Sequence, residues 1–299
     1  MKYRIGVDLG GTNIAVGVLD EGNNIISRAS TPTALPRPAD DIVRSIADTC
    51  IKAMADAGIE REDVLSVGVG TPGAVNLDGI VENDANLGFV NIPLRDMVMN
   101  LLNIRTFIGN DANCAALGEQ IAGSGKGTKN FIMVTLGTGI GGGIVVDGKL
   151  LTGVNGAAGE IGHMVIDHQG IPCQCGRIGC FEQYASATAL IRDAKARNLD
   201  ISGAKDVFDL ANGGNIVAAE VLDSYFDYLS TGLANLINIF QPEMIAIGGG
   251  IAGQGNALLE PLMKKVEEKR YTKYSNNQTV ITVAKLGNDA GIIGAASLS

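Results

Sequence analysis

The sequence of 299 residues contains no tryptophan, and aromatic residues make up only 4% of it. Proteins that bind single-stranded nucleic acid stack the bases on aromatic side chains, so this scarcity argues against that class. Charged residues are also few, at 18%, and acidic ones prevail, which gives a net charge of −9. Because binding of DNA or RNA needs a basic surface, we expect no nucleic-acid partner.

Long apolar runs are missing as well. No stretch of 18 or more uninterrupted apolar residues occurs, so we expect no transmembrane helix and no membrane partner. The N-terminus reaches Asp8 at once, unlike a signal peptide, which predicts a cytoplasmic protein. Thiols stay reduced there, so the five cysteines are expected to be free or to bind metal.

Glycine is the abundant residue, with 41 copies where average use predicts about 21. The 8 prolines show no matching excess, which argues against a linker or a collagen-like repeat. We therefore expect glycines at sites where backbones come close together.

The length of the chain predicts its number of domains. At about 150 residues per domain, 299 residues predict two domains.

A strand hairpin with a small-residue turn occurs twice. Residues 3–19 form two apolar strands, and Gly10 and Gly11 are expected to supply the positive φ of the turn. Residues 131–146 repeat the pattern around residues 137–139. This self-similarity predicts a duplicated α/β domain with a cleft between the copies.

Apolar periodicity places the other elements. It predicts strands at 24–30, 64–70, 105–109 and 244–247, and helices at 38–57, 111–122, 182–197 and 217–240. The domain boundary is expected near the glycine-rich stretch 123–127. We therefore divide the chain into an N-terminal α/β domain at 1–118, which a C-terminal helix at about 289–299 is expected to join, and a C-terminal α/β domain at 119–288 that contains the cysteine-rich loop.

The turns of both hairpins suit a nucleotide. In Asp8-Leu9-Gly10-Gly11-Thr12, bare amides can bind phosphate oxygens while the carboxylate holds Mg²⁺ through water. Gly137, Thr138 and Gly139 open a second loop that can bind phosphates from the other half. A plain hairpin turn and a closely packed strand remain the alternatives.

A third motif, Gly109-Asn110-Asp111, lies where a strand passes into a helix. Open α/β sheets bind ligands at such strand ends, so Asp111 is a candidate general base. The alternative is that Asp111 only caps the helix.

The sharpest motif contains three cysteines and a histidine. Cys173, Cys175 and Cys180 fall within eight positions, ten residues after His163. Three thiolates and an imidazole make a closed tetrahedral zinc site. A redox-active thiol pair is the alternative, but it leaves His163 without a role.

The remaining cysteines and histidine have ordinary explanations. Cys50 and Cys114 fall within helical patterns and are expected to be small buried residues. His168 is expected on the surface, although it is close enough in sequence to compete as a ligand.

These motifs, with Glu160-Ile161-Gly162-His163, resemble the ROK family of sugar kinases within the actin, Hsp70 and hexokinase superfamily. The resemblance spans essentially the whole chain. It implies two α/β domains of the actin-like ATPase (ribonuclease H-like) fold around a deep cleft, with the last helix returning to the N-terminal domain. It also implies ATP with Mg²⁺, structural Zn²⁺, and phosphorylation of a hexose at its 6-hydroxyl.

The resemblance further assigns roles to residues. It makes Asp111 the catalytic base and gives His163 a double role, with one ring nitrogen on zinc and the other towards the sugar. The positions that it matches to sugar contacts are Gly73, Asn86, Asn110, Glu160, His163 and Glu182. Gly249 and Gly250 fall where the family binds adenosine. About half of the glycines lie in or beside these segments, which is close to the whole surplus.

Within the family, glucose is the expected substrate. Thr71-Pro72-Gly73-Ala74-Val75 and Asn86-Leu87-Gly88-Phe89 resemble the glucokinase branch. N-acetylmannosamine kinase and fructokinase are the alternatives, and a sugar-responsive regulator is a more remote one. Relatives of this kind are often dimers or tetramers, so a homo-oligomer is expected.

Overall fold

The computed structural model describes residues 2–84 and 86–298. It divides into two compact units. Unit 1 contains residues 1–127, 143–159 and 285–299, and unit 2 contains residues 128–142 and 160–284. The first change of unit follows Gly127, at the end of the glycine-rich stretch 123–127, whereas residues 118 and 119 lie inside one helix.

The first sheet has the order β3-β2-β1-β4-β8. Its strands are β1 (Tyr3–Leu9), β2 (Asn13–Leu19), β3 (Ile25–Pro32), β4 (Val64–Thr71) and β8 (Thr106–Asn110). The first three strands run antiparallel as two hairpins, and β4 and β8 then continue in parallel with β1. The carboxyl ends of β1, β4 and β8 therefore share one edge.

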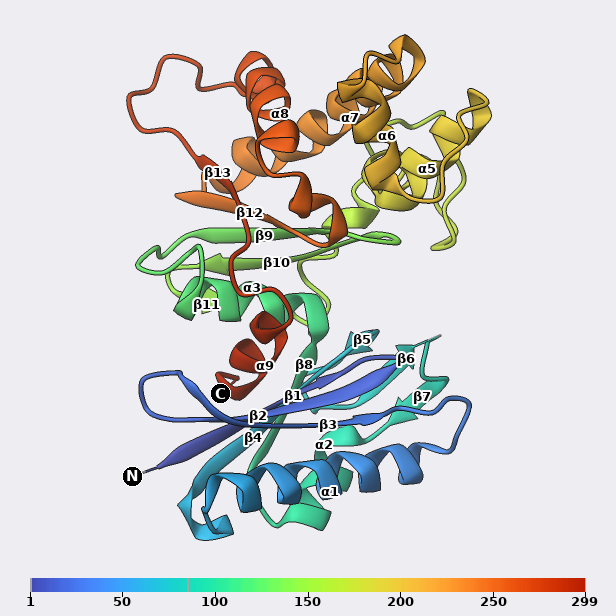
Figure 1. Ribbon diagram of the computed structural model, residues 1–299. Coiled ribbons are helices and arrows are strands. Elements are labelled where there is room, and N and C mark those ends of the chain that lie inside the picture. The colour runs from blue at the N-terminus through green and yellow to red at the C-terminus, as the bar shows by residue number, and fades with distance from the viewer. Residues whose placement is uncertain (1, 85, 299) are drawn as a thin grey trace. The chain divides into compact units, whose positions relative to one another are not determined.

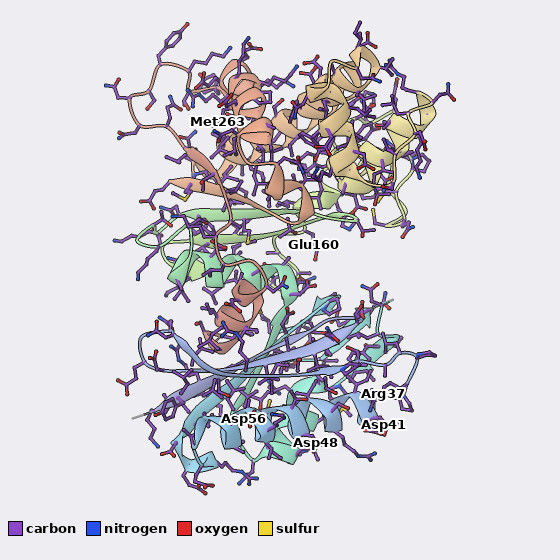
Figure 2. All side chains as sticks on the ribbon, viewed as in Figure 1. Arg37, Asp41, Asp48, Asp56, Glu160 and Met263 are labelled. Carbon is purple, nitrogen blue, oxygen red and sulfur yellow. The ribbon has the colours of Figure 1, made fainter. Side chains whose placement is uncertain are left out.

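Helices cover both faces of this sheet (Figure 1). On one face lie α1 (Ala39–Ala57) and α2 (Leu94–Leu102), which contact β2, β3 and β8. On the other lies α9 (Asp289–Ala296), backed by α3 (Asp111–Ala122). The amphipathic pattern explains α1, because its apolar side is buried while Asp48 and Asp56 stay exposed (Figure 2). Gly58 ends α1 in the left-handed conformation, which a residue without a Cβ adopts most readily.

A small antiparallel sheet adjoins this core. It consists of β5 (Ala74–Val75), β6 (Val81–Asp84) and β7 (Phe89–Ile92), in that order. These strands could not be predicted from the sequence, because runs of two to four residues carry too little periodicity.

The second sheet has the order β11-β10-β9-β12-β13, which repeats the order of the first. Its strands are β9 (Phe131–Leu136), β10 (Ile140–Val146), β11 (Lys149–Leu150), β12 (Met244–Gly248) and β13 (Val280–Val283). The helices of unit 2 are α4 (Glu182–Ala185), α5 (Ala187–Ala196), α6 (Ala204–Asn212), α7 (Ile216–Phe240) and α8 (Asn256–Lys269). The duplication predicted from the two hairpins thus extends to whole sheets, and the α/β class is confirmed.

Two local predictions were wrong. The helix expected over 182–197 is broken at Ser186, whose extended backbone ends α4 and whose hydroxyl oxygen accepts the Ala189 N–H to cap α5. Gly10 and Gly11 do not adopt positive φ. The hairpin instead closes through the Gly10 N–H, which donates to the Asn13 carbonyl at 2.9 Å.

Backbone approaches backbone where α9 packs. A Cβ added at Gly6 would lie 1.9 Å from the Ile292 carbonyl oxygen, and one at Gly68 would lie 1.7 Å from that of Ala295. On the other side of α9, a Cβ at Gly294 would lie 1.6 Å from the Cys114 carbonyl oxygen. No side chain fits at these positions, so part of the glycine excess serves helix packing rather than the binding motifs.

A buried carboxylate secures the chain that enters α9. Glu119 is fully buried, and its Oε1 accepts the N–H groups of Lys285 and Leu286 at 2.7 and 2.6 Å. Its Oε2 accepts both the N–H and the hydroxyl of Ser124, each at 2.7 Å. Four donors compensate the desolvation of the charge, which ties the end of α3 and the loop after it to the C-terminal segment of unit 1.

Among the described residues, no helix has the length and apolar character that a membrane span requires.

We predict that replacing Glu119 with alanine destabilises the protein by about 3–5 kcal/mol, because four donors lose a charged acceptor. Glu119→Gln should cost less, since one amide oxygen still accepts. Urea denaturation measures both. The exposed Glu220, paired with Arg197, serves as the control, and Glu220→Gln should change stability by less than about 1 kcal/mol. Equal effects at the two positions would refute the role of Glu119.

Candidate active site and metal centre

The carboxyl ends of β1 and β8 carry two predicted acids, both in unit 1. Asp8 lies one residue before the end of β1, and Asp111 is the first residue of α3, directly after β8. The α9 backbone comes close to Asp8, because a Cβ at Gly291 would lie 3.1 Å from the Asp8 Cγ. The parallel register of β1, β4 and β8 therefore brings two residues far apart in sequence to the same edge.

Burial and the charge of a neighbouring acid raise the pKa of each of these acids. The pKa of Asp8 rises from 3.8 to about 6, mainly because of burial and further because of the charge of Asp111. Burial also raises the pKa of Asp111, and the charge of Asp84 adds to that. A carboxylate with a raised pKa accepts a proton more readily, as a general base requires.

The helix cap is supplied by Asn110 rather than by Asp111. The Asn110 Oδ1 accepts the N–H of Asn113 at 3.1 Å, and its Nδ2 donates to the Gly73 carbonyl at 3.2 Å. The Asp111 Oδ1 accepts the N–H of the adjacent Ala112 at 2.7 Å, a bond that caps no later turn of the helix. Because Asn110 caps α3, Asp111 is not needed as the cap, which favours a functional role for Asp111.

Other predicted residues of unit 1 adjoin this edge. A Cβ at Gly11 would lie 3.9 Å from the Cβ of Asn86, so the Asp8–Thr12 loop and Asn86 are neighbours. Gly11, Thr12 and Asn86 are exposed. The loop is fixed from behind by Thr33, which the sequence analysis did not identify and whose hydroxyl donates to the Gly10 carbonyl at 2.6 Å.

Gly73 has a conformation and surroundings that exclude a side chain. Its φ is +88°, and an added Cβ would lie 2.4 Å from the Asn83 carbonyl oxygen. Nearby, Gly109 and Asn110 line a cavity of about 230 Å³ in unit 1. The predicted residues Gly73, Asn86, Asn110 and Asp111 thus come from three segments of one unit.

The second glycine loop belongs to unit 2. The Gly137 N–H donates to the Gly139 carbonyl at 3.1 Å, and the Gly137 carbonyl accepts the Ala187 N–H at 2.9 Å. A Cβ at Gly139 would lie 2.6 Å from the Glu182 Oε2. Thr138 is exposed at the tip of this turn. The loop is therefore held in place and leaves its outer surface free.

Gly249 follows β12 and lies against the end of the neighbouring strand β9. Its φ is +84°, and a Cβ there would lie 2.3 Å from the Leu136 carbonyl oxygen. Gly249 and Gly250 are both exposed, and Gly250 begins a short 3-10 helix over residues 250–254. These glycines thus follow β12 as Gly137 follows β9.

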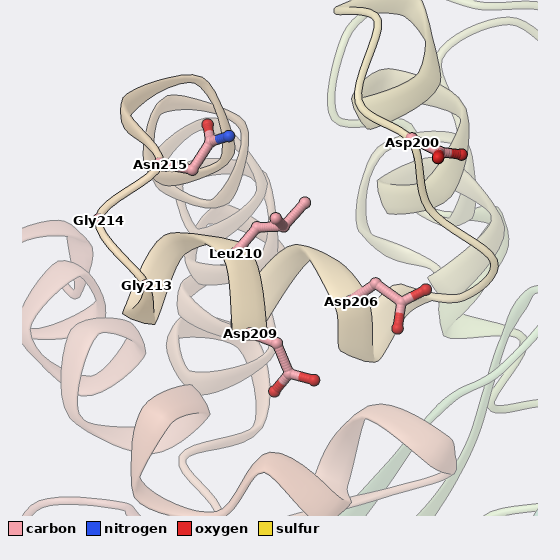
Figure 3. A pocket seen from close by; sticks show the side chains of 7 residues that line it. All are labelled: Asp200, Asp206, Asp209, Leu210, Gly213, Gly214 and Asn215. Carbon is pink, nitrogen blue, oxygen red and sulfur yellow. The ribbon is translucent and has the colours of Figure 1, made fainter.

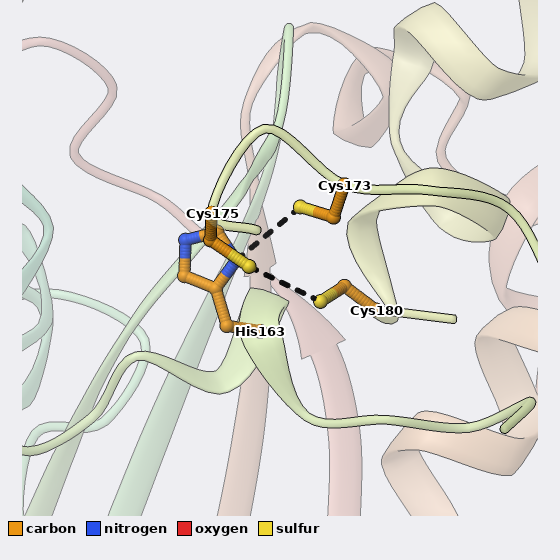
Figure 4. Close-up of side chains that lie close together, drawn as sticks. All are labelled: His163, Cys173, Cys175 and Cys180. Atoms are coloured by element: carbon orange, nitrogen blue, oxygen red, sulfur yellow. Dashed lines mark hydrogen bonds between the residues drawn. The ribbon is translucent and has the colours of Figure 1, made fainter. Parts of the chain in front are cut away.

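Four side chains of unit 2 converge on one point (Figure 4). The ligand atoms of His163, Cys173, Cys175 and Cys180 all lie within 4.8 Å of one another. The Cys173 Sγ lies 3.8 Å from the His163 Nδ1, and the Cys175 Sγ lies 3.6 Å from the Cys180 Sγ. Zinc–sulfur bonds of about 2.3 Å place tetrahedral ligand atoms about 3.8 Å apart, so this donor set fits zinc.

The loop geometry explains the short spacing of the cysteines. The Gly176 N–H donates to the Cys173 carbonyl at 3.0 Å, and Gly176 has a φ of +86°. A Cβ at Gly179 would lie 1.6 Å from the Asp167 carbonyl oxygen. The glycines therefore let the chain fold back on itself and present its thiols inward.

The ligand cluster adjoins two more predicted residues. The Glu182 Oε1 lies 3.1 Å from the Cys173 Sγ and 3.8 Å from the His163 Nδ1. Glu160 is exposed (Figure 2), and its carbonyl accepts the His163 N–H at 3.1 Å. His168 is exposed and does not belong to the cluster. Cys50 and Cys114 are fully buried, as predicted.

A groove beside α6 has a different character (Figure 3). Asp200, Asp206 and Asp209 line it together with Gly213 and Gly214. The Asp206 carboxylate is used locally, because it accepts the N–H groups of Ser202 and Gly203 before α6. The groove thus reflects the solvated end of a helix rather than a ligand site.

Comparison with known proteins gives one consistent result. A sequence model of the ROK family matches residues 4–299. The chain is 38% identical to a glucokinase of Halalkalibacterium halodurans, over 98% of this chain and 93% of that protein. It also resembles the structure of a ROK family glucokinase from Streptomyces griseus in complex with glucose and AMPPNP, with 35% identity, a TM-score of 0.81 and 99% coverage of both chains. A ROK hexokinase structure from Thermus thermophilus gives a TM-score of 0.88 at 32% identity, over 98% of this chain and 96% of the other.

We predict that Asp8→Asn stabilises the fold at pH 8. The folded pKa of about 6 exceeds the ordinary 3.8, so the ionised carboxylate costs stability above pH 6, and the cost disappears as the pH falls towards 4. About two pKa units correspond to at most about 3 kcal/mol, which partial exposure reduces to about 1–2 kcal/mol. Urea denaturation at pH 8 and pH 4 measures this. A variant that is less stable than the parent at pH 8 would contradict it.

Proposed function

This chain belongs to the ROK family, and from that premise we infer that it is an ATP-dependent hexose kinase that phosphorylates glucose at the 6-hydroxyl. Glucokinase relatives at 37–38% identity over nearly the full chain support glucose as the substrate. The observation that carries the chemistry is Asp111, a partly buried acid with a raised pKa at a strand end, whose helix is capped by its neighbour.

We propose Asp111 as the catalytic base. A sugar hydroxyl is a poor nucleophile, and a positioned carboxylate that accepts its proton contributes on the order of 10²–10⁴ in rate. Burial and the charge of Asp84 favour the protonated form of Asp111, which is the form that the proton transfer produces. The bond between the Asn110 Nδ2 and the Gly73 carbonyl fixes the residue before the base against the segment that contains Gly73.

We propose that the glycine turns bind ATP. Gly10, Gly11 and Thr12 in unit 1, and Gly137, Thr138 and Gly139 in unit 2, offer amides and hydroxyls to phosphate oxygens. Asp8 is assigned to the Mg²⁺ that accompanies the nucleotide, since a cation there would favour the ionised carboxylate. Gly249 and Gly250 are assigned to the adenosine. Because backbone dipoles supply the positive field, a protein of net charge −9 needs no basic patch for this ligand.

We propose that each unit contributes residues to the hexose. Gly73, Asn86, Asn110 and Asp111 come from unit 1, and Glu160, His163 and Glu182 come from unit 2. The His163 Nδ1 faces Cys173, so its other ring nitrogen remains for the sugar. N-acetylmannosamine and fructose are the competing substrates, and a coupled assay of ATP consumption across the three sugars decides among them.

We propose structural Zn²⁺ at His163, Cys173, Cys175 and Cys180, on the basis of the converging donors. Zinc there would fix the loop that carries His163 and leads into Glu182. A cytoplasmic location and a homo-oligomeric state, dimer or tetramer, stay predictions.

We predict that Asp111→Asn lowers kcat for glucose by at least about 10²-fold, because the amide cannot accept the proton. Glucose binding and the melting temperature should change little. Asp48→Asn, an exposed substitution on α1, serves as the control and should keep full activity. An Asp111→Asn enzyme with near-normal turnover would remove Asp111 as the base.

We predict about one zinc ion per chain in the purified protein, measured by elemental analysis. Cys175→Ser should lose most of the metal and weaken glucose binding, since the loop then lacks its fixed point. Cys50→Ala, which changes a buried thiol outside the cluster, should keep the zinc. Fully active protein without zinc would refute the assignment.

A further inference from the structure

Among the described residues, two acidic side chains are buried, Glu119 and Asp84. Four hydrogen bonds to Glu119 account for its place in the fold. Asp84 ends β6 with 5% of its surface exposed, and no motif in the sequence marks it. Since a buried charge is costly without partners, the partners of Asp84 show what its carboxylate does.

Its carboxylate organises the turn after β6. The Asp84 Oδ1 accepts the N–H of Asn86 at 3.1 Å, and its Oδ2 accepts the N–H of Leu87 at 2.6 Å. Leu87 is buried and anchors the turn in the core of unit 1, whereas the Asn86 side chain is exposed. The two bonds therefore fix the backbone from which Asn86 projects.

The backbone of Asp84 also lies against Gly73. A Cβ added at Gly73 would lie 2.6 Å from the Asp84 Cβ and 3.1 Å from its Cα. The Gly73 carbonyl is in turn held by the Asn110 Nδ2. Asp84 is thus connected through Gly73 to the residue that precedes Asp111.

The charge of Asp84 reaches Asp111 as well, since it adds to the rise in the pKa of that acid. One residue therefore touches Gly73, fixes the turn of Asn86 and acts on Asp111 by its charge. These are three of the four residues of unit 1 assigned to the hexose.

We propose that Asp84 is a positioning residue for the hexose, which holds the Asn86 turn against Gly73 and so sets the affinity for the sugar. This inference rests on the proposed function. The bonds of Asp84 act on the turn, whereas the Gly10–Thr12 loop has its own supports in Asn13 and Thr33. Sugar affinity should therefore depend on Asp84 much more than ATP affinity does.

The first test compares Asp84→Asn and Asp84→Ala in steady-state kinetics. Asparagine keeps one acceptor of nearly the same shape and should raise the KM for glucose about tenfold. Alanine removes both acceptors and should raise it further. The KM for ATP should change less than about threefold in Asp84→Asn, and kcat should change less than the KM for glucose does, because only the charge of Asp84, and none of its hydrogen bonds, acts on Asp111. If the alanine variant does not fold, Asp84→Asn decides alone.

Asn76→Ala is the matched control. The Asn76 Oδ1 accepts the N–H groups of Asp78 and Ile80. This variant therefore removes two similar hydrogen bonds from another turn of the same small sheet. It should leave the KM for glucose within about twofold of the parent. A similar rise in the KM for glucose in both variants would mean that any loosening of this sheet weakens sugar binding. That result would overturn the specific role of Asp84.

A double-mutant cycle tests the route through Asn86. In an Asn86→Ala background, adding Asp84→Asn should raise the KM for glucose by less than about twofold, because the side chain that Asp84 positions is gone. Independent, multiplicative effects would overturn the inference, as would an unchanged KM in the single variant. Failure of the parent enzyme to phosphorylate any hexose would instead refute the proposed function.

Discussion

The close packing of α9 is the constraint on which unit 1 depends. Its backbone meets Gly6 and Gly68 of the sheet on one side and α3 on the other. Helix and sheet can approach this closely only where no Cβ intervenes. The same helix places Gly291 beside Asp8, while α3 begins with Asp111. The sheet register places both candidate acids at one edge, and α9 packs beside Asp8 and against the helix that begins with Asp111.

The candidate site illustrates how a protein of net charge −9 can provide a triphosphate site. Partial burial and the charge of a neighbouring acid raise the pKa of both Asp8 and Asp111 in this acidic chain. The resulting cost in stability is a feature of many active sites, where charge is placed for chemistry rather than for folding. The cluster of His163 and three cysteines lies in the other unit, and Glu182 lies beside both Cys173 and Gly139. The loop that contains Cys173 and the turn that contains Gly139 are therefore both in contact with Glu182.

Local patterns predicted much of this structure. Both hairpins, α3 over Asp111–Ala122 and the convergence of His163 with three cysteines followed from residues near one another in sequence. The break at Ser186 did not, because apolar spacing continues across it. Asp84 and Glu119 could not be identified either, since an isolated acid in a sequence looks exposed and only the tertiary fold shows its burial. The glycine surplus was interpreted too narrowly, because Gly6 and Gly294 serve packing.

The return of α9 to the first unit also has a consequence for biosynthesis. Strand β1 ends at Leu9, but the helix that covers its face begins only at Asp289. A ribosome makes the chain from the N-terminus. The apolar face of β1 and β4 therefore lacks α9 while all of unit 2 is synthesised. The later unit can therefore complete its fold first, and the nascent first unit presents an open face that chaperones could bind until α9 emerges.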